Sequence, residues 1–106
     1  MILRIFLPRP RKPRFLIRQV RGDSMAPTLQ PGVIVFGVRP GKLRPGDVVI
    51  VHHNNQDKIK RVRQITSDKI FLTGDNFLQS TDSRDFGWLD VTLVLARVVW
   101  PKRARS

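Results

Sequence analysis

The sequence predicts an all-β domain of short antiparallel strands, arranged as a small barrel or sandwich. Runs rich in Val and Ile alternate with turn signals such as Pro31-Gly32, Pro40-Gly41 and Pro45-Gly46, a pattern typical of that class. No stretch shows the apolar period of about 3.6 residues that an amphipathic helix would require. A chain of 106 residues has room for one such domain.

Residues 1–16 are predicted to be a basic, proline-rich arm outside that domain. Three prolines stand among four basic residues in 8–14, and proline at this density favours an extended segment. Residues 1–21 carry seven basic groups and no acidic one, which accounts for much of the net charge of +12. Such an arm suits weak contact of residues 1–21 with nucleic acid, an anionic membrane surface or an acidic partner. The alternative is a solvated basic tail that aids solubility.

The domain itself is assigned to residues 17–101, with strands where β-branched runs lie between turns. One turn of helix is expected after Ser24 and another near residues 90–93. Residues 102–106 form a basic tail that we expect to be frayed. The strands are expected at residues 15–21, 33–38, 47–51, 57–66, 69–73 and 93–100.

The composition argues against several kinds of site and segment. The chain has no cysteine, which excludes a disulfide framework and a thiolate metal site. His52 and His53 are adjacent on an expected strand, where successive side chains point to opposite faces, so they cannot chelate one ion together. The apolar runs fall far short of the roughly 20 residues of a membrane-spanning helix. We expect a cytoplasmic protein without a transmembrane segment, a metal or another cofactor.

Ser24 is the first candidate for chemistry because it lies in a constrained turn. A nucleophilic serine needs an exposed hydroxyl, a base within hydrogen-bond reach and donors for the oxyanion. Gly22 permits a tight turn before Ser24, the apolar Met25 could help to exclude water from the site, and Pro27 fixes the direction in which the chain leaves the turn. Since the only two histidines are distant in sequence and no cysteine exists, lysine is the candidate base. The alternative is a serine with no role beyond the turn.

Two lysines are candidates for that base. Lys58 and Lys60 lie two residues apart in the expected strand 57–66, so they share one face, and Arg61 points to the other. A lysine base must be neutral when it acts, although its free pKa is about 10.4. Desolvation lowers that pKa by up to about 3–5 units when burial is complete. The alternative is a solvated basic face of a strand.

A third block follows downstream, where the turn Gly74-Asp75-Asn76 precedes the run Ser80-Thr81-Asp82-Ser83-Arg84. Small hydroxyls and a carboxylate beside an arginine suit a hydrogen-bonded loop that could hold a lysine ammonium in place. The alternative is an exposed pair between Asp82 and Arg84, which would contribute roughly 0–1 kcal/mol.

In this order, the three blocks resemble the type I signal peptidases, a family of serine proteases with a Ser/Lys dyad. The family pattern Ser-Met-x-Pro-Thr-Leu is matched from Ser24, Lys-Arg-Val from Lys60, and Gly-Asp-Asn-x-x-x-Ser-x-Asp-Ser-Arg from Gly74. The resemblance implies a small β fold like that of signal peptidases and SOS-repressor peptidases. It implies Ser24 as nucleophile, Lys60 as general base and Ser80 as the residue that orients the lysine. Support of the site is expected from Gly22, Met25, Pro27, Arg61, Gly74, Asp75, Asn76, Asp82, Ser83 and Arg84.

The chain also departs from the family. Some members place an oxyanion-donating serine two positions before the nucleophile, where this chain has Gly22. Typical members carry N-terminal transmembrane helices and a longer insertion before the third block. A small chain of this kind looks most like the maturation proteases of nickel-type superoxide dismutase, notably over residues 75–87 and 96–100. That likeness implies a processing protease whose partner is a protein precursor, the superoxide dismutase with its N-terminal propeptide. Separately from the likeness, we expect a monomer.

Three other functions stay open. The first is a signal peptidase acting on secretory precursors, which would have to reach the membrane. The second is a self-cleaving SOS-type repressor, for which residues 1–16 are too short to hold a DNA-binding domain. The third is a non-enzymatic basic β-barrel that binds nucleic acid. The charge of +12 favours it, but the few aromatic residues lie mostly at strand or block positions. We therefore expect no nucleic-acid partner.

Overall fold

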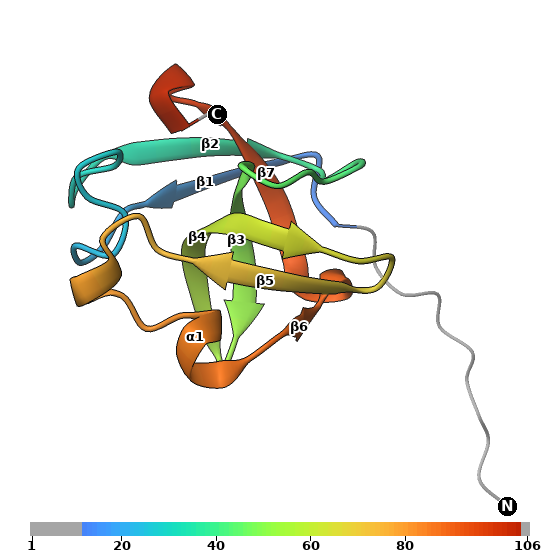
Figure 1. Cartoon of the computed structure of the whole chain (residues 1–106). Helices are drawn as coiled ribbons and strands as arrows, with labels where there is room; N and C mark the ends of the chain where they lie inside the picture. Colours follow the sequence, from blue (N-terminus) through green and yellow to red (C-terminus); the bar gives the residue numbers. More distant parts are fainter. Residues whose placement is uncertain (1–11, 105–106) are drawn as a thin grey trace, which may run out of the picture.

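The computed structural model describes residues 12–104, so most of the predicted arm and the last two residues of the tail lie outside the described part. Within that part, seven strands form one antiparallel sheet in the order β1-β2-β7-β3-β4-β5-β6 (Figure 1). The prediction of an all-β chain is confirmed. The strands are β1 (Phe15–Gln19), β2 (Ile34–Val38), β3 (Val48–His53), β4 (Gln56–Ile65), β5 (Lys69–Thr73), β6 (Leu89–Asp90) and β7 (Val94–Trp100).

The sheet is continuous and bent, and hydrogen bonds between its edge strands do not close it into a barrel. Its edges within the described residues are β1 and β6. Among the described strands β1 pairs with β2 alone, and a gap separates its other edge from β4. Arg18 of β1 bridges that gap through an ion pair with Asp57 of β4, at 2.8 Å.

The core lies on both faces of β3, whose first four residues are all buried. Because side chains alternate along a strand, Val48 and Ile50 enter the first core cluster, together with Val35 and Val98. Val49 and Val51 enter the second core cluster, together with Ile70 and Leu72. A strand that is buried on both faces needs apolar side chains at successive positions, which explains the sequence Val-Val-Ile-Val at residues 48–51. Burial of each such side chain contributes about 1.5–3 kcal/mol.

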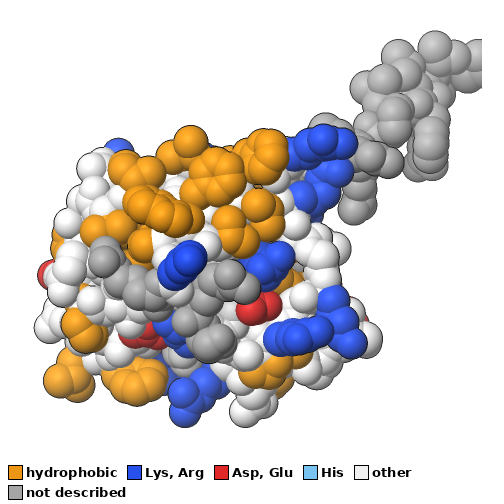
Figure 2. Space-filling model, turned by 90° about the horizontal axis from the view of Figure 1, so that it is seen from above, with side chains coloured by type: hydrophobic (Ala, Val, Ile, Leu, Met, Phe, Trp, Pro, Cys, Tyr) orange, Lys and Arg blue, Asp and Glu red, His pale blue; other side chains and the backbone are white. Residues whose placement is uncertain are grey.

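A second apolar surface remains exposed on the outer side of β1, β2 and β7. The register places Ile17 of β1 opposite Phe36 of β2, and Phe36 opposite Trp100 of β7. The Phe15 ring lies 5.4 Å from that of Phe36. Phe15, Ile17, Ile34 and Trp100 are each at least 45% exposed. Figure 2 views this side of the molecule and shows the apolar side chains gathered there.

Short helical segments complete the fold. The expected turn after Ser24 is present, with Leu29 N–H bonded to Met25 O at 2.9 Å, and so is the turn near residues 90–93, as a 3-10 helix at Val91–Leu93. The helix α1 (Ser83–Phe86) was not predicted, because four residues are too few to show a period. The expectation of a frayed tail was wrong for residues 102–104. Lys102–Ala104 form a 3-10 turn, and Ala104 is buried in the first core cluster.

Candidate active site

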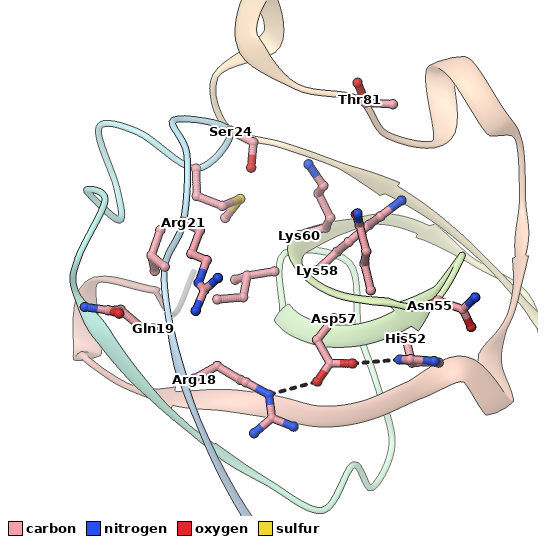
Figure 3. A pocket seen from close by; sticks show the side chains of 14 residues that line it. Arg18, Gln19, Arg21, Ser24, His52, Asn55, Asp57, Lys58, Lys60 and Thr81 are labelled. Atoms are coloured by element: carbon pink, nitrogen blue, oxygen red, sulfur yellow. Dashed lines mark hydrogen bonds and ion pairs between the residues drawn. The ribbon is translucent and has the colours of Figure 1, made fainter.

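A cleft of about 940 Å³ lies between β1 with its following turn and β4 (Figure 3). One wall comes from β1 and from the turn that carries Ser24, called the serine turn below. The other wall comes from the β3–β4 hairpin. The loop before α1 adds Thr81 at the rim. Ser24, Lys60 and Thr81 all line this cleft, so the fold brings the three predicted blocks to one cavity. The lining residues are 18–21, 24–25, 52, 55–60 and 81.

Ser24 is held by the turn that the sequence predicted. Gly22 has φ of +71°, a left-handed conformation that glycine adopts at no steric cost and other residues rarely adopt. Ala26 N–H then bonds to Asp23 O at 3.1 Å, which tightens the backbone around the serine. Met25 is buried in the first core cluster and also lines the cleft, so it anchors the turn from below. Pro27 is exposed in the same turn.

Lys60 is buried, with only 5% of its surface exposed. Its Nζ donates a hydrogen bond to Ser80 Oγ at 3.0 Å. Burial lowers the pKa of Lys60, and the charge of Asp82 offsets part of that effect. A lowered pKa increases the fraction of neutral amine at a given pH, which is the form that accepts a proton.

Lys58 has a different environment, although it lies on the same strand face. Its Nζ is 3.2 Å from His53 Nδ1 and 5.0 Å from the centre of the Phe86 ring. Alternation along the strand does not distinguish the two lysines. Their contacts do, because only Lys60 is both buried and bonded to Ser80.

Ser80 and Asp82 continue the hydrogen-bond chain that starts at Lys60. Ser80 Oγ donates to Asp82 Oδ2 at 2.9 Å, and Gly74 N–H donates to the same oxygen at 2.9 Å. Arg84 bonds both Asp82 oxygens through its guanidinium. Burial alone would raise the pKa of Asp82, but these hydrogen bonds outweigh it and hold the pKa well below its usual range. Asp82 is therefore a buried carboxylate, and the exposed pair considered from the sequence is excluded.

The turn at Gly74 packs directly against the serine turn. Asn76 N–H donates to Ser24 O at 2.9 Å. A Cβ at Gly74 would collide with Ser80 Oγ and Ser24 O, so only glycine fits between them. The third block therefore fixes the relative positions of the serine turn and the lysine strand.

Arg61 and Asp75 secure the same junction from the other face of β4. The Arg61 guanidinium forms two hydrogen bonds of 2.8 Å with the Asp75 carboxylate, and a third, of 2.7 Å, with Gly46 O. Burial opposes ionisation of Asp75, but hydrogen bonds from Arg61 and from Thr28 of the serine turn lower its pKa. Ser83 lies farther from the cleft, where its buried Oγ accepts a hydrogen bond from Leu72 N–H at 2.8 Å.

Ser24 and Lys60 face the cleft from separate elements, the serine turn and β4 (Figure 3). Among the described residues, the hydrogen bond of the Lys60 amine is to Ser80, with none to Ser24. The two groups thus share a water-accessible space in which a substrate carbonyl would have to lie.

Three residues at the other end of the cleft, Arg18, His52 and Asp57, were not predicted from the sequence to belong to the site. Asp57 accepts a hydrogen bond from Arg18 Nε at 2.8 Å, and its second oxygen lies 2.8 Å from His52 Nδ1. The bond to His52, followed by that to Arg18, lowers the pKa of Asp57. Arg18 and Asp57 are 39 residues apart, and no local pattern links positions that distant.

Residues 12–104 also bear on metal binding and on membrane insertion. No cluster of three His, Cys, Asp or Glu side chains there is placed to bind a metal ion. In the same part of the chain, no helix combines the length and the apolar character needed to cross a membrane.

Comparison with known proteins gives a consistent result. Residues 4–92 match the model of a family described as Peptidase S24-like. The chain is similar to signal peptidase IB of Staphylococcus aureus, with 34% identity over 79 residues, covering 70% of this chain and 41% of that protein. It is also similar to mitochondrial inner membrane protease subunit 1 of Homo sapiens, with 31% identity over 110 residues, covering 76% of this chain and 66% of that protein. The chain thus spans about two fifths of the length of the staphylococcal relative.

Proposed function

Since this chain belongs to the Peptidase S24-like family, we propose that it is a serine endopeptidase in which Ser24 is the nucleophile and Lys60 the general base. One observation carries the proposal: a buried lysine of lowered pKa shares a cleft with a serine on a constrained turn. A lysine in water is too fully protonated at neutral pH to act as a base, and burial of Lys60 shifts its pKa in the direction that a base requires.

The proposed reaction begins with the transfer of a proton to Lys60. Neutral Lys60 Nζ takes the proton of Ser24 Oγ as the oxygen attacks the carbonyl carbon of the scissile peptide. The Lys60 ammonium then protonates the leaving nitrogen, the C–N bond breaks, and an ester to Ser24 remains. Water attacks this ester while Lys60 again accepts a proton. The Lys60 ammonium returns that proton to Ser24 Oγ as the ester C–O bond breaks, and the new carboxyl end of the substrate leaves.

Ser80 positions the base through the direction of its hydrogen bonds. A serine hydroxyl has one proton to donate. Ser80 donates it to Asp82, so its oxygen can only accept from Lys60. A neutral amine that donates one N–H to Ser80 keeps its lone pair for the proton of Ser24. In this role Ser80 is a positioning residue.

The backbone of Ser24 supplies the donor for the oxyanion. Among residues 12–104, the Ser24 N–H forms no internal hydrogen bond and remains available to a substrate oxygen. Gly22 contributes no hydroxyl there, and its φ of +71° would strain a serine at that position. The oxyanion site of this chain therefore depends on backbone donors.

The substrate that we propose is a protein precursor with a short N-terminal propeptide, namely that of nickel-type superoxide dismutase. Support comes from the likeness of residues 75–87 and 96–100 to the maturation proteases of that enzyme. The cleft also runs along the unpaired edge of β1, where an extended peptide can add as a strand.

A second candidate substrate is a secretory precursor cut at a membrane surface. The exposed apolar face of β1, β2 and β7 favours it, because such a face together with a basic arm suits a lipid surface. The two candidates differ in the precursor that is cut and in whether vesicles accelerate the cut.

A cleavage assay tests the proposal. Wild type, Ser24→Ala and Lys60→Ala are each mixed with a nickel superoxide dismutase precursor and, separately, with a secretory precursor, and the products are identified by mass spectrometry. We expect one cut at the propeptide junction, lost in both variants. The controls are Ser67→Ala and Lys69→Ala, which change an exposed serine and an exposed lysine outside the cleft. A cut that persists in Ser24→Ala would contradict the proposed nucleophile, and a cut in the secretory precursor alone would replace the proposed substrate.

A further inference from the structure

We propose that the cleft contains a binding subsite for an acidic side chain of the substrate, formed by Arg21 and Lys58. The subsite rests on the proposed peptidase function, and it names the class of sequence that the site prefers. The substrate would carry an Asp or Glu within a few residues of the scissile bond.

The cleft holds more cations than its own acid can neutralise. Besides Lys60, the proposed base, its lining includes Arg18, Arg21 and Lys58, but Asp57 is its single carboxylate among the described residues. Both oxygens of Asp57 are already engaged, one by Arg18 and the other by His52, each at 2.8 Å. Asp57 is therefore not available to balance Arg21 or Lys58.

Lys58 is held in place by neutral groups. Its Nζ donates to His53 Nδ1 and lies over the Phe86 ring. Burial and the nearby Lys58 charge lower the pKa of His53, which favours the neutral imidazole that can accept this hydrogen bond. The contacts orient the ammonium without cancelling its charge, and two of its protons remain for another acceptor.

Arg21 lies on the opposite wall, just after β1 (Figure 3). Its side chain is exposed, and within residues 12–104 it forms no ion pair with a carboxylate. A guanidinium in this state can bind a carboxylate with two parallel hydrogen bonds. Arg21 follows the strand edge along which the substrate is proposed to lie, and Lys58 lies on the strand that carries Lys60, so the two cations flank the path of the peptide.

Charge-assisted hydrogen bonds distinguish Asp from Asn at the same size. We therefore expect wild type to cleave a peptide with Asp at the preferred position about tenfold faster in kcat/KM than the matched Asn peptide. A Lys at that position would be rejected, because it would face two like charges. The preference is expected to weaken with salt, since the subsite is open to solvent.

The test scans one residue of an extended Ala/Ser host peptide through Asp, Asn and Lys at each position around the cut. Wild type is compared with the double variant Arg21→Glu/Lys58→Glu, for which the preference is expected to reverse toward Lys. The matched control is Arg63→Glu, an exposed residue of β4 outside the cleft lining, which changes the overall charge without changing the subsite. Equal kcat/KM for Asp and Asn in wild type, or the same loss of preference in Arg63→Glu, would overturn the proposal.

Binding separates this inference from the peptidase proposal. Fluorescence anisotropy of labelled host peptides on Ser24→Ala reports affinity without any cleavage. Tighter binding of the Asp peptide, lost in Ser24→Ala/Arg21→Gln/Lys58→Gln, supports the subsite even if wild type cuts no peptide. Equal affinity for the three peptides contradicts it, even if wild type cuts all of them. Circular dichroism of each variant shows that a lost preference does not come from unfolding.

Discussion

Lys60 and Ser80 are 20 residues apart in the sequence, yet Lys60 Nζ donates to Ser80 Oγ at 3.0 Å. This contact exists because Asp82 binds the Ser80 hydroxyl and the Gly74 amide through one carboxylate oxygen. Lys60 is thus oriented by a loop that the buried Asp82 carboxylate holds in place.

Replacing Ser80 by Ala removes the acceptor that orients Lys60. We expect kcat to fall by about 10- to 100-fold, the scale of a misplaced catalytic group, with little change in KM. Ser80→Thr keeps the hydroxyl and should recover most of kcat. Steady-state kinetics on a cleaved precursor check this, and an unchanged kcat in Ser80→Ala would exclude the positioning role.

The rate of cleavage should depend on the protonation of Lys60. A general base acts only when neutral, so kcat/KM is expected to rise with pH through the pKa of Lys60 and then level off. Because burial lowers that pKa, the midpoint of the rise should lie below the ordinary value of 10.5. Profiles between pH 5 and pH 10 check this on peptides without titratable groups. A flat profile would contradict Lys60 as the base.

Lys60→Met should stabilise the protein while abolishing cleavage. Folding lowers the pKa of Lys60, so the unfolded chain binds more protons between the folded pKa and 10.5. The stability of wild type therefore rises with pH across that window, and the buried ammonium opposes folding below it. We expect a gain of about 0.5–2 kcal/mol at pH 7, typical of residues kept for function. Urea unfolding at pH 7 and pH 10 checks the gain, which should shrink at the higher pH.

Asp82→Asn should destabilise the fold by roughly 3–5 kcal/mol, because it leaves buried donors and a cation without their carboxylate. The matched control is Asp90→Asn, whose exposed pair with Lys69 contributes no more than about 1 kcal/mol. Since folding depresses the pKa of Asp82, its stabilisation is present above the unfolded pKa and is lost as pH falls through the folded one. The difference between wild type and Asp82→Asn is therefore expected to persist at pH 5 and to shrink only in strong acid.

Local sequence patterns were sufficient for most strands. The six expected strands occur near their predicted bounds, because alternation, β-branching and turn residues act over a few neighbours. β6 and α1 were missed since two and four residues are too short to show a period. The helix did leave a signal: Asp82 and Asp85 form a capping box around its first turn.

The burial of the tail could not be read from its composition. Lys102–Ala104 are basic in sequence, but Ala104 fills a space in the first core cluster, and its carbonyl accepts a hydrogen bond from Arg61 at 3.3 Å. Exposure depends on what the rest of the chain places beside a segment, and these partners are distant in sequence.

The sequence by itself determined the all-β class, the strands and the three blocks that resemble a Ser/Lys peptidase, since each depends on neighbouring residues. The likeness of Lys60-Arg61-Val62 to the family pattern pointed to Lys60, but alternation leaves Lys58 and Lys60 equivalent. Only the tertiary structure gives the physical difference between them, because it depends on what packs on each side chain. It also decided the charge of the cleft. Asp57 meets Arg18 across a gap that hydrogen-bonded strands do not span, so its carboxylate does not neutralise Arg21 or Lys58.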